Sequence, residues 1–188
     1  MKRNILKALL PLLLSLLIVL AFGCILDPKE DIKPPPDNDD DFKDLTDKTD
    51  VGFNLVESYK KRNIDKFKEL LHKEYIWYLQ DRDVEPGEEN WWSRETDERV
   101  TDRIFDEANR LELTIEFHRP VPLPELGGEP CDDCWEISGD YFITAQFQPE
   151  GTIYNGNDLV KLIIVPVNDP DDGGRKEYRL LMAYDIEN

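Results

Sequence analysis

The segment NLVESYKKRNIDKFKELLHKEYIWYL, residues 54–79, carries the pattern that decides the fold of this chain. Apolar residues recur at helical spacing up to Tyr59, and Thr46 can cap the helix that they predict. Asn63 can cap a second, shorter helix, IDKFKELL, and a strand-like run, EYIWYL, follows it. The segment therefore predicts two short helices that lead into the first strand of a sheet.

Downstream of this segment the sequence predicts one more helix and then a series of strands. WWSRETDERVTDRIFDEA, residues 91–108, has Ser93 as a potential N-cap and places Val100 and Ile104 on one face. The apolar period then changes to two in LELTIEF, and GDYFITAQF, DLVKLIIVPV and EYRLLMAYDI are further strands. Connections such as VPLPELGGEPCDDC are expected to be loops because they are rich in glycine, proline and aspartate. This order predicts a single α+β domain over residues 45–188, with N-terminal helices packed on a curved antiparallel β-sheet.

The N-terminus is organised like a secretory signal peptide. A basic start, MKRNILK, precedes the apolar run ALLPLLLSLLIVLAFG, which ends before Cys24. A membrane-spanning helix is the alternative, but the run falls short of the ~20 residues that such a helix needs, and Pro11 interrupts it. The sequence LAFGC, residues 20–24, resembles the lipobox of bacterial lipoproteins. The resemblance implies that residues 1–23 are cleaved, that Cys24 is acylated, and that this lipid anchors the protein in the cell envelope.

Residues 24–44 are expected to form a disordered tether between the lipid and the domain. They contain three consecutive prolines and an acidic run, with few apolar side chains to bury. Asp37–Asp41 suggests a calcium site, but the run lacks the alternating ligands, the glycine and the distal glutamate of an EF-hand loop. A solvated acidic linker is therefore favoured.

The charge of the chain restricts its partners. The formal net charge is −18, and loss of Lys2, Arg3 and Lys7 with the signal peptide would make the remainder more negative still. Nucleic acids and anionic membrane surfaces are disfavoured as partners, because both would repel this charge. The expected partners are the membrane, through the lipid, and an unidentified small-molecule or protein ligand.

The predicted domain resembles the nuclear-transport-factor-2-like superfamily, which includes ketosteroid isomerases and polyketide cyclases. The resemblance rests on Tyr59 late in the first helix, the polar break Arg62-Asn63, the paired Leu70-Leu71, and the strand start Glu74-Tyr75. The third helix and the final MAYDIEN also occupy the expected places. The resemblance implies a cone-like fold with an open apolar pocket, lined by one face of LELTIEF, YFITAQF and YRLLMAY.

Aromatic residues are the candidate ligand contacts. The resemblance implies that Tyr59, Tyr75 and Trp77 lie near the mouth or the wall of the pocket, and the alternative is that they fill the core. Trp91 and Trp92 can pack as a staple against the helix that follows, or contact a ligand. Because two adjacent side chains rarely both bury, one of them is expected to be exposed.

No catalytic constellation is evident in the sequence. The resemblance implies that an enzyme of this superfamily needs a carboxylate or histidine base, with a tyrosine or protonated acid stabilising the oxyanion. His72 is expected to be solvated at a helix end, and His118 is out of phase with the apolar face of its strand. Asp140 and Asp185 could serve as bases, although Asp140 follows Gly139 and is expected in a turn or bulge.

Motifs of other reaction classes are missing as well. The sequence suggests no Ser-His-Asp or Cys-His arrangement, no phosphate loop and no metal-binding helix, so neither a cofactor nor a metal is expected. A non-catalytic ligand-binding or interaction domain is therefore favoured, and the alternative is an isomerase- or cyclase-like enzyme that uses the pocket.

Cys131 and Cys134 form a C-x-x-C motif within EPCDDCW. A zinc site completed by His72 and His118 would have unsuitable spacing, and the acids around the motif would raise the thiol pKa and oppose a redox centre. With Cys24 assigned to the lipid, a disulfide formed in an oxidising compartment is the plainest account. It is expected to close a short loop before a strand and to contribute roughly 2 kcal/mol.

Overall fold

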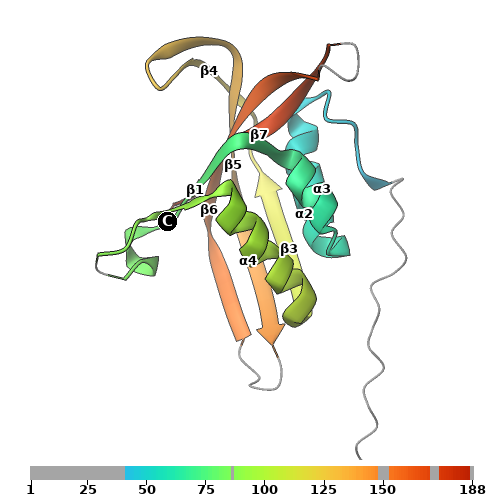
Figure 1. Ribbon diagram of the computed structural model, residues 1–188, viewed down its shortest axis with the longest axis vertical. Helices are drawn as coiled ribbons and strands as arrows, with labels where there is room; N and C mark the ends of the chain where they lie inside the picture. Colours follow the sequence, from blue (N-terminus) through green and yellow to red (C-terminus); the bar gives the residue numbers. More distant parts are fainter. Residues whose placement is uncertain (1–40, 86, 148–152, 170–173, 187–188) are drawn as a thin grey trace, which may run out of the picture. The chain divides into compact units, whose positions relative to one another are not determined.

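The computed structural model describes residues 41–85, 87–147, 153–169 and 174–186. The expected signal peptide, Cys24 and the tether before residue 41 lie outside the described residues. Helices pack against one side of a seven-stranded sheet (Figure 1). Within the described parts of the chain, no helix combines the length and the apolar composition that crossing a membrane requires.

The helices form where the sequence predicts them, as α2 (Lys48–Lys61), α3 (Ile64–Leu70) and α4 (Arg94–Glu107). Asn63 and Ser93 cap α3 and α4 as predicted, each accepting a hydrogen bond from a backbone N–H. The prediction of Thr46 as the first cap is wrong. Asp47 caps α2 with its Oδ1 2.8 Å from the backbone nitrogen of Thr49, and its carboxylate also suits the positive end of a helix.

The strands are β1 (Leu71–Tyr78), β2 (Trp91–Ser93), β3 (Ala108–Phe117), β4 (Val121–Leu126), β5 (Glu129–Phe147), β6 (Ile153–Asp169) and β7 (Arg175–Ile186). Their order in the sheet is β2-β1-β7-β6-β5-β3, and β4 pairs with β5 outside this path. The prediction of a purely antiparallel sheet is wrong at one pairing, because β1 runs parallel to β7. Parallel strands need a long connection, and here nearly the whole domain lies between the two strands. The α+β class is confirmed, with a mixed sheet.

Strand β5 begins earlier than the sequence predicts and ends at Phe147, as predicted. The expected loop VPLPELGGEPCDDC forms β4, a turn at Gly127 and Gly128, and the start of β5. Both glycines have positive φ angles, 64° and 87°, which other residues rarely adopt. Asp140 lies within β5, opposite Glu116, and not in a turn. The preceding Gly139 allows close packing, because a Cβ there would lie 2.9 Å from the carbonyl oxygen of Glu116.

The core lies between the helices and the sheet. Tyr59 on α2 meets Phe67 on α3 and Phe105 on α4 edge to face, with ring centroids 5.9 and 5.1 Å apart. These contacts join the three helices, and each large apolar side chain buried in the core contributes about 1.5–3 kcal/mol. The main cluster of buried side chains includes Val51, Leu55, Phe67, Leu70, Leu162, Ile164, Leu180 and Ala183.

The chain that precedes α2 is hydrogen-bonded to the domain. Asn54 Oδ1 accepts a bond of 2.9 Å from the backbone nitrogen of Lys43, and Asn54 Nδ2 donates one of 2.8 Å to the Lys43 carbonyl. The backbone nitrogen of Tyr178 donates to the carbonyl of Leu45 at 2.8 Å. These bonds hold residues 43–45 against α2 and β7.

Candidate functional site

An apolar cavity of about 240 Å³ lies between the helices and the sheet. It exceeds the engineered cavity of about 150 Å³ that binds benzene, so it has room for one ring with a short substituent. Leu113, Ile143 and Leu180 bring to it the faces of β3, β5 and β7 that were expected to line a pocket. The helices add Leu55, Val100 and Ile104.

Four of the five aromatic residues that were expected to contact a ligand line this cavity, and the fifth is exposed on the surface. Tyr59, Tyr75, Trp77 and Trp92 all line the cavity, and Trp77 lies opposite Trp92 in the antiparallel pairing of β1 with β2. Trp91 is the exposed member of the tryptophan pair, with 39% of its surface accessible. It lies at a separate depression in the segment between β1 and α4.

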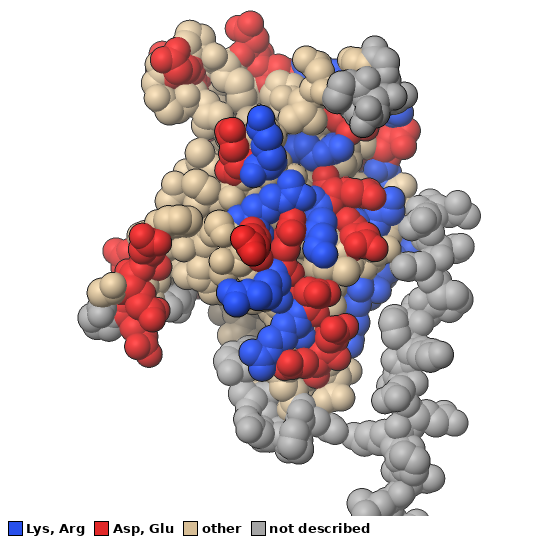
Figure 2. Space-filling view, viewed as in Figure 1, with Lys and Arg blue, Asp and Glu red and all other residues tan. Residues whose placement is uncertain are grey.

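That depression is acidic. Its lining includes Trp91 and four acidic residues, Asp81, Glu85, Glu88 and Glu89. Figure 2 shows acidic side chains gathered on the protrusion that contains this segment, whereas Lys and Arg alternate with Asp and Glu over the helices. The depression is therefore separated in chemistry, as well as in position, from the apolar cavity.

A buried carboxyl group lines the cavity. Asp97 lies in the first part of α4, just after the Ser93 cap, and exposes 6% of its surface. Its Oδ2 has no hydrogen-bond partner among the described residues. Burial raises the pKa of Asp97 to about 7, and a hydrogen bond with Tyr75 opposes the rise in part. The cavity therefore contains an acid that changes its charge near neutral pH.

Two tyrosines on neighbouring elements lie near Asp97, and Tyr75 is hydrogen-bonded to it. Tyr75 on β1 is buried, and burial together with the nearby charge of Asp97 raises its pKa well above the usual value. Burial also raises the pKa of Tyr59 on α2, whose hydroxyl lies 3.4 Å from Thr101 Oγ1. Both tyrosines therefore stay neutral at physiological pH.

A second carboxyl group lines the cavity from the end of β7. Asp185 Oδ1 accepts hydrogen bonds from Tyr141 Oη at 3.1 Å and from Gln80 Nε2 at 2.9 Å. These two hydrogen bonds hold the Asp185 carboxyl group in place. The walls of the cavity are thus mostly apolar, with one acidic group from α4 and one from β7.

Sequence reasoning singled out Asp185 but missed Asp97. Asp97 precedes Val100 and Ile104 by one and two turns, so all three share the apolar face of the predicted helix. An acid on the core-facing side of an amphipathic helix was the signal that could have identified it. This signal is ambiguous, because Asp and Glu are also favoured in the first turn of any helix.

The other candidate bases lie away from the cavity lining. His72 is in β1, and its predicted place at a helix end is wrong because α3 ends one residue earlier than predicted. His118 follows β3 on the surface, with Nε2 3.1 Å from Asp140 Oδ2 and Nδ1 3.3 Å from Ser138 Oγ. Ser, His and Asp are therefore brought together, contrary to expectation. However, the histidine and aspartate side chains are about half exposed, which leaves this set solvated.

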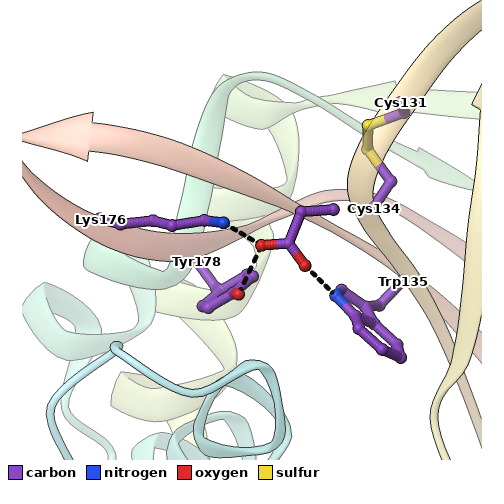
Figure 3. Close-up of a disulfide and its surroundings, with 6 residues drawn as sticks. Cys131, Cys134, Trp135, Lys176 and Tyr178 are labelled. Carbon is purple, nitrogen blue, oxygen red and sulfur yellow. Dashed lines mark hydrogen bonds and ion pairs between the residues drawn. A yellow bond between two sulfur atoms is a disulfide. The ribbon is translucent and has the colours of Figure 1, made fainter.

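Cys131 and Cys134 form a disulfide, as predicted. Its predicted position in a loop is wrong, because both cysteines belong to β5, near the turn that joins it to β4. Figure 3 shows Lys176, Tyr178 and Trp135 directed at one carboxylate. It belongs to Asp133, the residue that precedes Cys134. Burial alone would raise the pKa of Asp133, but these three hydrogen bonds outweigh it and lower the pKa to about 2.

This polar cluster has a structural role. Tyr178 Oη and Trp135 Nε1 each donate to Asp133 at 2.7 Å, and Lys48 lies 4.0 Å from the centre of the Trp135 ring. The contacts connect β5 with β7 and α2. The described residues include no group of three or more His, Cys, Asp or Glu side chains arranged to hold a metal ion. Most of the acidic run Asp37–Asp41 lies outside those residues.

Comparison with known proteins identifies the fold but not a family. No protein-family model matches the sequence, and no curated protein matches it. A conserved protein from Planctomyces limnophilus is similar in structure, with a TM-score of 0.54 at 12% identity, covering 72% of this chain and 88% of that chain. An NTF2-like protein of unknown function in nutrient uptake from Rhodospirillum rubrum has a TM-score of 0.50 at 10% identity, covering 73% and 95%.

One similar structure is an enzyme. A type 2 hexachlorocyclohexane dehydrochlorinase has a TM-score of 0.50 at 8% identity, covering 74% of this chain and 82% of its own. At such identities the likeness shows the fold alone. The chain thus has the NTF2-like fold, and this fold is shared by an enzyme and by a protein of unknown function.

Proposed function

We propose that this protein is a bacterial cell-envelope lipoprotein whose NTF2-like domain binds a small, largely apolar molecule in the cavity behind α4. The observation that carries the binding role is the cavity itself, where aromatic and aliphatic walls surround a buried, incompletely bonded carboxyl group on Asp97. Ligand sites commonly combine apolar walls with a few polar groups that orient the ligand. The lipobox-like LAFGC supports the anchoring role.

Filling the cavity tests the binding role. Ile143→Trp would place a larger side chain in the cavity, and Phe142→Trp is its matched control because Phe142 is the next residue of β5 and is 47% exposed. We expect calorimetry to detect phenethyl alcohol binding to the native protein and to Phe142→Trp, but at least tenfold weaker binding to Ile143→Trp. Equal binding by both variants would place the site elsewhere.

The anchoring role has its own test. Cys24→Ser should abolish labelling of the protein by a radioactive fatty acid and leave its signal peptide uncleaved at this position. Cys131→Ser is the control, and it should leave the labelling unchanged. Labelling that persists in Cys24→Ser would contradict the proposed anchor.

The pKa of Asp97 supports a second candidate function, catalysis of proton transfer. A general base works best when its pKa lies near the working pH, and Asp97 has a pKa of about 7 beside neutral tyrosine hydroxyls. In such a reaction the Asp97 carboxylate would take a proton next to a carbonyl group, and a hydroxyl in the cavity would hydrogen-bond the enolate oxygen.

Deuterium exchange can test this second candidate without knowledge of the substrate. The methyl protons of acetophenone in deuterium oxide should exchange faster with the native protein than with Asp97→Asn, and the rate should rise as the pH passes through about 7. Equal rates for the two proteins would remove the catalytic candidate and leave the binding role in place.

A further inference from the structure

The cavity has an unbalanced distribution of charged groups. Asp97 and Asp185 line it, while none of the described lining residues is a lysine, an arginine or a histidine. An anionic ligand would have to enter an apolar space whose described lining offers carboxyl groups and no cationic side chain. Burying an unpaired charge in this way is strongly unfavourable, so we expect carboxylate- and phosphate-bearing molecules to bind weakly.

One carboxyl oxygen in the cavity is free to accept a hydrogen bond. The Asp97 side chain is buried, with only 6% of its surface exposed. Its Oδ2 has no hydrogen-bond partner among the described residues. A buried carboxyl oxygen without a partner carries a desolvation cost that a suitable donor would recover. The best donor for a carboxylate is a charged N–H group, whose hydrogen bonds are roughly twice as strong as those between neutral groups.

The walls around this carboxyl group also suit a cation. Trp77 and Trp92 lie side by side in paired strands, and Tyr59 and Tyr75 line the same space. Aromatic faces attract ammonium groups, by about 2 kcal/mol or more when water is excluded. The formal net charge of −18 adds a long-range attraction for cations approaching the domain.

We propose that the ligand of this cavity is a small aromatic or aliphatic amine, whose ammonium group pairs with Asp97 while its apolar body fills the space between α4 and the sheet. This inference rests on the proposed binding function and specifies its ligand class. The size of the cavity suits one ring with a short side chain, because a space of about 150 Å³ holds benzene and this one has about 240 Å³.

Pairing with an ammonium group requires Asp97 to be ionised, which gives the binding a distinctive pH dependence. The groups that face Asp97 are Tyr75 on β1, Tyr59 on α2 and Glu98 on its own helix. The pKa values of both tyrosines are raised, so neither loses its proton near neutral pH. Amine affinity should therefore rise as the pH increases from about 5 to about 8, with release of a proton at the lower end.

A series of three probes of matched size tests the inference on the full-length protein. Phenethylamine, phenethyl alcohol and phenylacetate share a ring and a short chain but differ in charge. Calorimetry at pH 8 should give at least tenfold tighter binding for the amine than for the alcohol, with phenylacetate weakest. Asp97→Asn should weaken amine binding at least tenfold and change alcohol binding less than threefold.

The possible failures are distinguishable. If the alcohol binds as tightly as the amine, or if amine affinity does not rise with pH, the amine inference is overturned while the binding role survives. If none of the three probes binds at millimolar concentration, both are overturned. The probe series with the native protein decides the matter even if Asp97→Asn does not fold.

Discussion

Trp77 and Trp92 lie directly opposite each other in the pairing of β1 with β2, and both line the apolar cavity. Side chains on directly opposed positions of an antiparallel pair are close neighbours, so both tryptophans line the same part of the cavity. The remaining tryptophans, Trp91 and Trp135, do not contribute to the described lining. The protein therefore has two tryptophans that report on the cavity and two that serve as internal references.

Intrinsic fluorescence should detect occupation of the cavity. A bound aromatic amine or alcohol would replace water beside Trp77 and Trp92 and change their emission. In Trp92→Phe this change should fall by about half, whereas Trp91→Phe should retain it, because Trp91 is an exposed neighbour outside the cavity. If Trp91→Phe removes the signal and Trp92→Phe does not, the probe binds at the acidic depression.

Asp97 should make the stability of the protein depend on pH in an unusual direction. Its pKa is about 7 in the folded state and about 3.8 in the unfolded chain, so the folded state holds the extra proton between these values. Its contribution is most favourable below about pH 4 and is lost as the pH rises to about 7. At pH 8, Asp97→Asn should be more stable than the native protein by roughly 2–4 kcal/mol.

Urea denaturation at pH 4 and at pH 8 would measure this effect. The advantage of Asp97→Asn should be large at pH 8 and small at pH 4. Asp106→Asn is the control, since Asp106 is exposed on the same helix and should show no comparable gain. A native protein that gains stability from this site with rising pH would contradict the burial of the Asp97 carboxyl group.

Asp133 should have the opposite effect on stability. Three hydrogen bonds hold its pKa at about 2, below the unfolded value, so its contribution is present above about pH 4 and lost as the pH falls to about 2. Asp133→Asn should cost about 1 kcal/mol at pH 7, a modest value because the partner Lys176 is half exposed. Thermal unfolding should show no difference from native near pH 2, and Asp132→Asn is the exposed control.

The tight packing at Gly139 gives a test of the β3–β5 register. A Cβ at this position would lie 2.8 Å from the Ile115 side chain and 2.9 Å from the Glu116 carbonyl. Gly139→Ala should therefore destabilise the domain by about 1–3 kcal/mol. Asp140→Ala alters the next, exposed residue and should change the free energy of unfolding by less than about 0.5 kcal/mol. Equal stabilities of the two variants would show that the register differs.

Much of the fold was predictable because its signals are local. The spacing of apolar residues and the caps Asn63 and Ser93 located the helices, and the period of two located the strands. The parallel pairing of β1 with β7 was not predictable from these patterns, because it is a contact between the two ends of the domain. The expectation of a turn or bulge at Asp140 is wrong, since a glycine that permits close packing looks the same in sequence as one in a turn.

The candidate site was predictable in its walls but not in its chemistry. The strand faces that line the cavity follow from alternation, and the resemblance to NTF2-like proteins indicated Tyr59, Tyr75 and Trp77. The local pattern places Asp97 only on the apolar face of its helix, and its raised pKa depends on burial by side chains from other elements. The pairing of β2 with β1 likewise determines that Trp92, and not Trp91, lines the cavity.

The most direct test of the binding site is the position of a bound molecule. A crystal structure of the protein soaked with a bromine-bearing phenethyl alcohol would locate the bromine by its anomalous scattering. We expect a peak inside the cavity, within contact distance of Trp77, Trp92 and Ile143. A peak at the acidic depression beside Trp91, with an empty cavity, would contradict the proposed binding site.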